Sequence, residues 1–309
     1  MSTIPGRSLS VDVVIVNWNS GNLLSRCLGS ITRLERTGFE LGRIVVVDNA
    51  SSDDSTTVDP SLLTDLVRNA ENRGFGRACN QGAALGQGDL ILLLNPDVTL
   101  EPDSLTIPVR RMAEDATVDT VGIELVDDGG NVHRSCCRIP TVGSLLVHSF
   151  GLDRVGVFAR HGYPMYEWAH DESRFVDHVI GAFYLVRRRT FDALGGFDER
   201  FFVYLEDLDL SKRIKDRGGR CLYLADASAH HVGGGTTRTI KARRLAYSLH
   251  SRLKYAAKHH GRIGLVLVAL ATLLVEPLIR IAIAAARFSW TDVKAVAVGY
   301  AHLYGSLVR

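Results

Sequence analysis

The chain has 309 residues and a mass of 33.9 kDa, with 46% hydrophobic and 23% charged residues. This composition is that of a globular protein, and it excludes fibrous and disordered classes. Thirty-six basic and 34 acidic residues leave a net charge of only +2, which argues against a general nucleic-acid-binding protein. The charge is uneven, because residues 236–309 hold 12 basic and 2 acidic residues whereas residues 1–235 hold 24 and 32. We therefore expect the basic C-terminal part to meet something anionic.

The cysteines and the N-terminal residues bear on the cellular compartment. There are five cysteines, an odd number, and no two of them have CxxC spacing. This usage predicts neither a disulfide framework nor a zinc site, and it favours a reducing compartment. The first ten residues are polar and contain no apolar signal core. We expect a cytoplasmic protein or one that is peripheral on the inner face of the cell membrane.

Strands and helices alternate over the first hundred residues. Apolar, β-branched runs predict buried parallel strands at 11–16, 43–47 and 90–94, with a short strand at 66–67. Helical spacing of apolar residues predicts helices at 22–34 and 77–85. This alternation predicts a doubly wound α/β sheet with helices on both faces. Ligands of such sheets bind beyond the carboxyl ends of the strands, where the sequence places Asn17, Asp48 and Asp97.

The second half of the chain is less regular until residue 179. The sequence then predicts a strand at 179–186, a helix from about Glu206 to Asp216 that ends at a Gly-Gly pair, and a strand at 220–224. A loop over 225–235 is expected to carry His230 and His231.

The C-terminal region is basic and then apolar. Residues 243–260 predict a basic helix, and the thirteen apolar residues 263–275 are followed by Glu276-Pro277. Thirteen residues fall short of the roughly 20 that a membrane-spanning helix needs, so we expect a proline-kinked helix lying in the membrane interface. Two alternatives are a helix packed on the catalytic domain with a solvated basic face, and a homodimer seam over 263–286.

Several carboxylates and histidines have both a structural and a chemical interpretation. Asp97 either caps a turn after Asn95-Pro96 or holds a divalent ion that bridges two phosphates. Asp48 either forms part of a helix cap or accepts hydrogen bonds from a nucleoside. Glu206 and Asp207 either stabilise a helix N-terminus or include a general base. His230 and His231 are either ordinary loop residues or candidate metal ligands beside Asp97. The glycines around Asn72 and Gly74 are only a weak phosphate-binding signal.

In this order, the motifs resemble glycosyltransferase family 2, and they are most similar to its rhamnosyltransferase-like branch. The resemblance covers residues 10–260 and rests on seven blocks: VVIVNWNS (13–20), VVVDNASSD (45–53), ENRGFGRACNQG (71–82), LLLNPDV (92–98), GAFYLVRRRTFDALGGFDERFF (181–202), YLEDLDLSKRIKDRG (204–218) and HHVGGGTT (230–237). It implies the glycosyltransferase-A fold, with a catalytic domain at 1–240 and a basic and apolar helical segment at 241–309. Within that domain, residues 10–98 would bind the nucleotide and residues 99–240 the acceptor.

The resemblance also implies the chemistry and its residues. The reaction would be an inverting, metal-dependent transfer from a nucleotide-diphosphate sugar to a hydroxyl of a lipid-linked or cell-surface glycan, such as a polyprenyl-linked one. Asp97 and His230, with His231 as the alternative, would hold Mn²⁺ or Mg²⁺. Asp207 would be the catalytic base, with Glu206 positioning the acceptor. The donor would be bound by these residues: Asn17, Asn19, Asp48, Asn72, Gly74, Asn95 and Asp97.

Other functions are less well supported by the sequence. The branch suggests rhamnose from dTDP-rhamnose, while a UDP-hexose or galactofuranose donor stays open. A sugar-phosphate nucleotidyltransferase would need a lysine-bearing loop after the first strand, and residues 17–21 contain no lysine. A non-catalytic nucleotide-sugar-binding protein would have no need to keep Asp97, Asp207 and His230 together.

Overall fold

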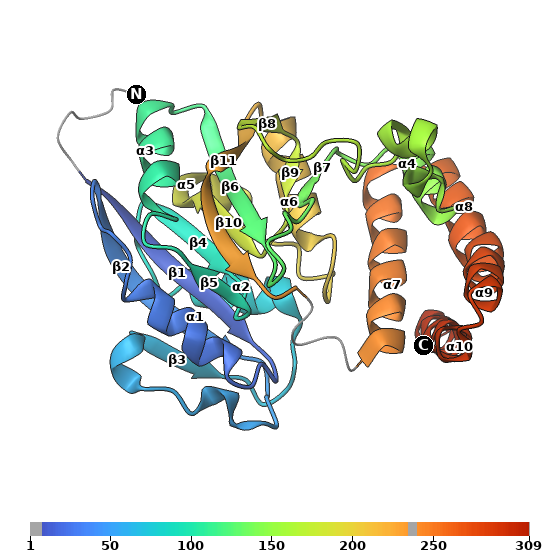
Figure 1. Ribbon diagram of the computed structural model, residues 1–309, viewed down its shortest axis with the longest axis horizontal. Coiled ribbons are helices and arrows are strands. Elements are labelled where there is room, and N and C mark those ends of the chain that lie inside the picture. The colour runs from blue at the N-terminus through green and yellow to red at the C-terminus, as the bar shows by residue number, and fades with distance from the viewer. Residues whose placement is uncertain (1–7, 234–239, 309) are drawn as a thin grey trace.

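The computed structural model describes residues 8–233 and 240–308, which form a mixed sheet flanked by helices and, beside it, a group of C-terminal helices (Figure 1). Within these residues the main sheet has the spatial order β3-β2-β1-β4-β10-β6-β11-β5, and β8 pairs with β11. Its strands are β1 (Leu9–Asn17), β2 (Phe39–Asp48), β3 (Asp65–Arg68), β4 (Leu90–Leu94), β5 (Val98–Leu100), β6 (Val118–Val126), β8 (Arg174–Val176), β10 (Phe183–Arg187) and β11 (Arg220–His231). Strands β3, β2, β1 and β4 run parallel, as do β6 and β11, whereas β10, β5 and β8 pair antiparallel with their neighbours. The α/β fold predicted from the sequence is confirmed, and the antiparallel pairs make its sheet a mixed one.

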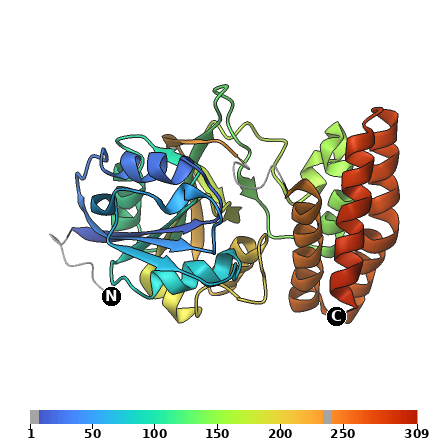
Figure 2. The ribbon, with the colours of Figure 1, turned by 90° about the horizontal axis from the view of Figure 1, so that it is seen from below.

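Successive side chains of β1 point into two different hydrophobic layers. Val11, Val13 and Ile15 pack with helices α1 (Leu23–Ile31) and α3 (Thr106–Glu114). Val14 and Val16 belong to the opposite layer, which is covered by α2 (Phe75–Ala83), α5 (Arg188–Ala193) and α6 (Glu206–Asp216). The two helical layers lie on either side of the sheet in Figure 2. A strand buried on both faces explains why the run 11–16 is almost continuously apolar.

Two regions of the second half differ from the sequence prediction. The predicted strand at 179–186 is interrupted at Gly181-Ala182, so that a short β9 (His178–Val179) pairs with β7 (Cys136–Cys137) before β10 begins. The predicted strand at 220–224 is longer than expected, because β11 continues to His231. After an irregularity between Leu224 and Ser228, β11 pairs again with β6 and also gains β5 as a neighbour. His230 and His231 therefore lie in a strand, not in a loop. Their side chains point to opposite faces.

The C-terminal helical unit consists of α7 (Lys241–His259), α8 (Gly261–Leu270), α9 (Glu276–Ala286) and α10 (Trp290–Leu307). A segment from the middle of the chain joins it, because Leu145 of α4 (Val142–Ser149) packs against Val268 of α8 and Leu253 of α7. The remaining short turns are η1 (Asp54–Thr56), η2 (Pro60–Leu62), η3 (Leu152–Arg154) and η4 (Gly156–His161). Figure 1 shows α7 between the sheet and the other C-terminal helices.

The apolar helix is longer than the thirteen residues that the sequence suggested. Helices α8 and α9 are joined by a π-helical turn at Ala271–Val275, η6, so that residues 261–286 form one helical stretch of 26 residues. Pro277 falls in the first turn of α9, where a missing N–H is tolerated, and the wider π turn comes directly before it. By length and composition alone, this is a helix that could cross a membrane, and only 22% of its most apolar window is buried.

A buried ion pair fixes this helix to α7. Glu276 is 1% exposed and contacts Arg252 of α7, whose side chain is 4% exposed, as well as Arg280 one turn further along α9. Arg252 also donates to the hydroxyl group of Ser149 in α4 at 2.9 Å. Three helices therefore meet at one guanidinium group.

We predict that Glu276→Leu lowers the free energy of unfolding by about 3–5 kcal/mol, because it leaves the Arg252 charge buried without a carboxylate partner. Urea denaturation would measure the change. The double variant Glu276→Leu/Arg252→Met should recover most of the loss, since it removes both charges. A loss below about 1 kcal/mol in the single variant would mean that the Glu276–Arg252 pair stabilises the protein no more than a surface ion pair does.

Candidate active site

Asn17 and Asp48 end two neighbouring parallel strands and lie side by side. Asn17 Nδ2 donates to Asp48 Oδ1 at 2.9 Å and to Ser55 Oγ at 2.9 Å, while its Oδ1 accepts a hydrogen bond from Ser20. Asn17 is 0% exposed. The polar atoms of its side chain are thus hydrogen-bonded within the protein. Asn17 orients Asp48 and is not exposed to a ligand.

The loops after β1 and β2 are tied together by further polar contacts. Asp48, 5% exposed, accepts from Ser51 Oγ at 2.5 Å. Asn19 has a left-handed backbone, with φ of 48°, and its Oδ1 accepts from the Ser52 N–H at 2.7 Å. Between Asn17 and Asn19, the side chain of Trp18 lines a cavity. The sequence analysis did not select Trp18, although a tryptophan between two asparagines in a polar loop was a usable signal.

Gly74 stands where only glycine fits. Its φ is +87°, and a Cβ atom there would lie 2.3 Å from the carbonyl oxygen of Phe202. Phe75 N–H donates to that same oxygen at 2.7 Å, and Asn72 Oδ1 accepts from the Gly74 N–H at 3.0 Å. The glycine block is therefore a close contact with the segment before α6, and it brings Asn72 to the cavity wall.

The structure separates the two histidines. His231 Nε2 lies 3.4 Å from Asp97 Oδ1, and both side chains are buried. His230, the first choice from the sequence, instead contacts Asp128, with Nε2 to Oδ1 at 2.9 Å. The reason is the pairing of β11 with β5, which sets His231 opposite Val98, the residue after Asp97. The structure thus corrects the register: His231, not His230, is the histidine beside Asp97. Residues 234–237 of the HHVGGGTT block lie outside the described residues.

Backbone strain is concentrated just before the acidic pair. Tyr204 and Leu205 have φ values of 70° and 64°, a left-handed conformation that is costly for large side chains, and α6 begins at the next residue. Tyr204 lines the cavity, and Glu206 and Asp207 occupy the first turn of α6. Such strain is typical of functional sites.

Glu206 and Asp207 lie in different environments. Glu206 is 4% exposed, and burial together with the negative charge of Asp207 raises its pKa well above the usual value. Asp207 is held by two backbone N–H groups, from Gly181 to Oδ2 at 2.8 Å and from Leu208 to Oδ1 at 2.8 Å. His178 Nε2 lies 3.8 Å from Asp207 Oδ2. The neutral form of Glu206 is thus favoured, whereas the carboxylate of Asp207 has a fixed orientation.

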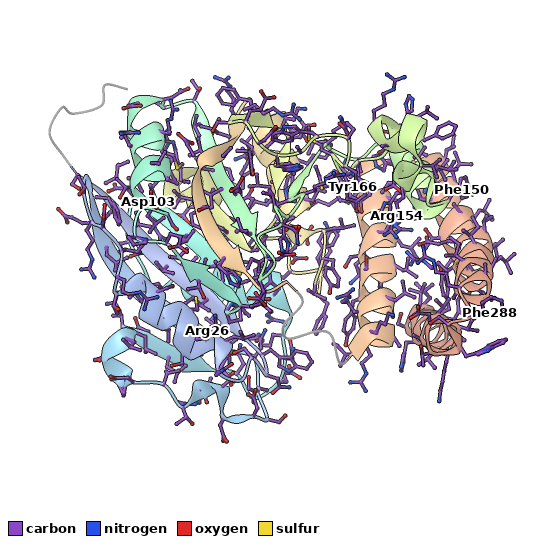
Figure 3. The ribbon with its side chains drawn as sticks, in the orientation of Figure 1. Arg26, Asp103, Phe150, Arg154, Tyr166 and Phe288 are labelled. Atoms are coloured by element: carbon purple, nitrogen blue, oxygen red, sulfur yellow. The ribbon has the colours of Figure 1, made fainter. Side chains whose placement is uncertain are left out.

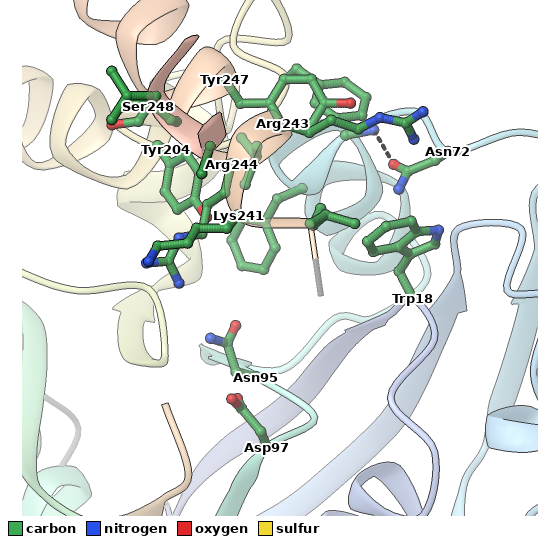
Figure 4. A pocket seen from close by; sticks show the side chains of 18 of the residues that line it. Trp18, Asn72, Asn95, Asp97, Tyr204, Lys241, Arg243, Arg244, Tyr247 and Ser248 are labelled. Atoms are coloured by element: carbon green, nitrogen blue, oxygen red, sulfur yellow. Dashed lines mark hydrogen bonds between the residues drawn. The ribbon is translucent and has the colours of Figure 1, made fainter. Parts of the chain in front are cut away.

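A cavity of about 1050 Å³ lies between the carboxyl edge of the sheet and the C-terminal helical unit. In Figure 4, Asn95 and Asp97 lie on one side of it, and Lys241, Arg243 and Arg244 project from α7 on the other. Of the residues predicted from the sequence, the wall contains Asn72, Gly74, Asn95, Asp97 and His231. It does not contain Asn17, Asn19, Asp48, Glu206 or Asp207. Wall residues that the sequence analysis did not select include Trp18, Asn49, Phe75, Tyr204 and Tyr247.

Asp207 is nonetheless connected to the cavity through the turn before β10. Gly181 donates to Asp207, and the carbonyl oxygen of the next residue, Ala182, accepts from Asn95 N–H at 2.9 Å. The side chain of Asp207 is 18% exposed. Asp207 and the backbone of Asn95 are therefore held by two successive residues, Gly181 and Ala182.

The donor set beside Asp97 fits a divalent cation in part. A carboxylate and an imidazole suit Mn²⁺, and His231 Nδ1 is buried with no hydrogen-bond partner among the residues that the structure describes. Over residues 8–233 and 240–308, however, no group of three or more His, Cys, Asp or Glu side chains has the geometry of a metal site. Two protein ligands with substrate phosphate oxygens would be the usual arrangement for a hard cation of this kind.

Residues 12–148 match the model of glycosyl transferase family 2, and the sheet and helices have the glycosyltransferase-A fold. Residues 12–148 thus resemble family 2 glycosyltransferases, and the resemblance to the rhamnosyltransferase-like branch is confirmed by the relatives of the chain. An N-acetylglucosaminyl-diphospho-decaprenol L-rhamnosyltransferase of Mycobacterium tuberculosis is 28% identical over 273 residues, which cover 81% of this chain and 85% of the relative. Rhamnosyltransferase WbbL of Escherichia coli is 27% identical over 194 residues, covering 60% of this chain and 70% of the relative.

Solved structures share the fold at low identity. The mannosyltransferase PcManGT of Pyrobaculum calidifontis, in complex with GDP-Man and Mn²⁺, has a TM-score of 0.56 and 20% identity, covering 99% of this chain and 88% of its own. GalNAc-T7 with UDP, GalNAc and Mn²⁺ has a TM-score of 0.54 and 18% identity, covering 72% of this chain and 43% of its own. Both of these structures contain Mn²⁺.

The raised pKa of Glu206 predicts a pH-dependent stability. Between the ordinary pKa of the unfolded chain and the raised pKa of the folded one, folding takes up a proton, so this residue destabilises the protein increasingly as the pH rises. We compare the thermal midpoint of Glu206→Gln with that of the unmodified protein. The difference between them should shift in favour of the variant as the pH rises from about 5 to 8. Exposed Glu101→Gln is the control and should show a constant difference. A constant difference for Glu206→Gln as well would contradict the raised pKa.

Proposed function

We propose that the protein transfers a rhamnosyl group, with inversion, from dTDP-rhamnose to a hydroxyl group of a lipid-linked glycan. The observation that carries this proposal is a cavity with Asp97 and His231 on its sheet side and the fixed Asp207 carboxylate behind its wall. The choice of rhamnose and of a lipid-linked acceptor is supported by the name of the mycobacterial relative, which matches over 81% of this chain.

Asp97 and His231 would hold a divalent cation, Mn²⁺ or Mg²⁺. When bound, such an ion neutralises the negative charge on the diphosphate leaving group. The amide side chains of Asn72 and Asn95 line the cavity and would bind the donor by hydrogen bonds. Trp18 offers an aromatic face to the donor at this end of the cavity.

Asp207 would take the proton from the acceptor hydroxyl while that oxygen attacks the anomeric carbon. Its two N–H donors and the nearby His178 fix the direction in which the carboxylate faces. A single base suffices, because the nucleotide diphosphate leaves as an anion and needs little help from an acid. This differs from glycoside hydrolysis, where paired carboxylates act on both sides of the bond.

The protein would act on the cytoplasmic face of a membrane, bound to its surface. Large apolar side chains of the 261–286 helix are exposed, among them Ile263 at 79%, Leu274 at 60% and Leu278 at 68%. Phe288, labelled in Figure 3, is 86% exposed in the turn between α9 and α10, and Trp290, the first residue of α10, is 74% exposed. Glu276 holds the other side of the helix against α7, so only one face is available to lipid.

We predict that Asp207→Asn lowers kcat by about 10²–10⁴-fold, because it removes the general base. The variant should still bind the donor nucleotide with Mn²⁺, since Asp207 is outside the cavity wall. Transfer to a lipid-linked N-acetylglucosamine acceptor and a thermal-shift titration with dTDP, UDP and GDP would measure the two properties. A variant with full turnover would exclude Asp207 as the base, and a shift with UDP alone would exclude dTDP-rhamnose.

His231→Gln should weaken the metal-dependent binding of nucleotide by at least about tenfold, a loss typical of disturbed metal sites. His230→Gln is the matched control, because His230 contacts Asp128 on the opposite face of β11. Thermal-shift titrations with and without Mn²⁺ would compare the two variants. Equal losses, or a larger loss in His230→Gln, would rule out His231 as the ligand.

A further inference from the structure

The wall of the cavity is divided by charge. On the sheet side, the ionisable residues are Asp97 and His231, among amide side chains. On the side of the helical unit, the wall has basic residues from three elements and one acidic residue, Asp292. The basic residues are Arg154, Lys241, Arg243, Arg244, Arg280 and Arg287.

Within residues 8–233 and 240–308, three of these side chains have no hydrogen-bond or ion-pair partner: Arg243, Arg244 and Arg287. Lys241 pairs with Asp292, and Arg280 pairs with Glu276 at 2.6 Å. Among the residues that the structure describes, the guanidinium groups of Arg243 and Arg244 make neither a hydrogen bond nor an ion pair, and both residues are exposed. Each guanidinium group presents a fork of N–H donors that suits phosphate oxygens. The site is therefore built to receive an anion with several oxygen atoms.

The same part of the cavity is also apolar. Ile283 and Ala284 of α9 and Ala295 and Val296 of α10 line it next to the arginines. The wall residues of α9 and its C-terminal cap are spaced three or four apart, so they share one face of the helix: Arg280, Ile283, Ala284 and Arg287. A free nucleotide has no hydrocarbon chain to pack on the apolar residues of this wall. A diphosphate attached to a hydrocarbon chain matches both the basic and the apolar residues.

We propose that Arg243 and Arg244, assisted by Arg280 and Arg287, bind the diphosphate of a prenyl-diphosphate-linked acceptor, and that the α9–α10 wall holds the first isoprene units. The inference rests on the proposed function, because it names the acceptor site of that same reaction. The two diphosphates are then held on opposite walls, with that of the donor near Asp97 and that of the acceptor near α7. This separation keeps two strongly anionic groups apart while their sugars meet between them.

The test measures binding of the full-length protein to phosphatidylcholine vesicles that contain undecaprenyl diphosphate, undecaprenyl monophosphate or phosphatidylglycerol at equal charge. The unmodified protein should bind the diphosphate vesicles most tightly. Arg243→Gln/Arg244→Gln should lose at least about tenfold of that binding, as expected when charged hydrogen bonds are removed. The matched control is Arg262→Gln/Lys294→Gln, which removes the same charge from exposed positions outside the cavity wall. Its binding to all three kinds of vesicle should fall by one common, smaller factor.

Three outcomes would overturn the inference. Unchanged binding of Arg243→Gln/Arg244→Gln to diphosphate vesicles would show that the arginines are not the site. An equal loss in both double variants would show a general attraction to anionic surfaces. A loss of Mn²⁺-dependent nucleotide binding as large as the loss of vesicle binding would assign the arginines to the donor. The vesicle assay involves no sugar transfer, so a failure of the proposed reaction would appear separately, as absent turnover with diphosphate binding intact.

Discussion

Asp209 joins helix α6 to the C-terminal helical unit. Its side chain is fully buried in α6, two residues after Asp207, and it accepts from Arg213 Nε at 2.8 Å, Lys258 Nζ at 2.7 Å and His259 Nε2 at 2.7 Å. Burial alone would raise the pKa of Asp209, but the hydrogen bonds from His259 and Lys258 and the charge of Arg213 bring it below its usual value. A carboxylate with three donors from two helices fixes α7 relative to α6. The cavity and both of its walls depend on that arrangement.

Other contacts at the same junction explain how the strained turn before α6 can persist. Phe201 and Leu208 pack on Tyr255 of α7 in a small buried cluster, and Ser251 Oγ donates to the Val203 carbonyl at 2.8 Å. The left-handed residues Tyr204 and Leu205 lie between these anchors. Packing on both sides offsets an unfavourable backbone that, by itself, would relax. The helical unit thus supports the geometry of the acidic pair as well as forming a wall of the cavity.

The sequence was sufficient to predict the sheet, the positions of Asn17, Asp48 and Asp97 at or after strand ends, and the start of α6, because each depends on local periodicity and on polar residues after apolar runs. It could not show that Asn17 is enclosed by Asp48 and serine hydroxyl groups, since those contacts cross between loops. The choice between His230 and His231 needed the pairing of β11 with β5. The length of the apolar helix was underestimated because Glu276 and Pro277 are typical of a helix end. In the structure, Arg252 neutralises the charge of Glu276, and a π turn comes directly before Pro277, so the helix continues.

The distribution of thiols has a consequence for the chemical behaviour of the molecule. Cys27, Cys79, Cys136 and Cys221 are buried and Cys137 is partly buried; burial raises the pKa of every one of these thiols. All five lie on the sheet or on the elements that cover it, and the described part of the helical unit has none. Because the thiolate is the reactive form, the folded protein is protected from oxidation and alkylation at these positions. Each thiol becomes reactive only when the part of the sheet region that buries it unfolds. The rate of thiol modification therefore measures local unfolding of the sheet region and not of the helical unit.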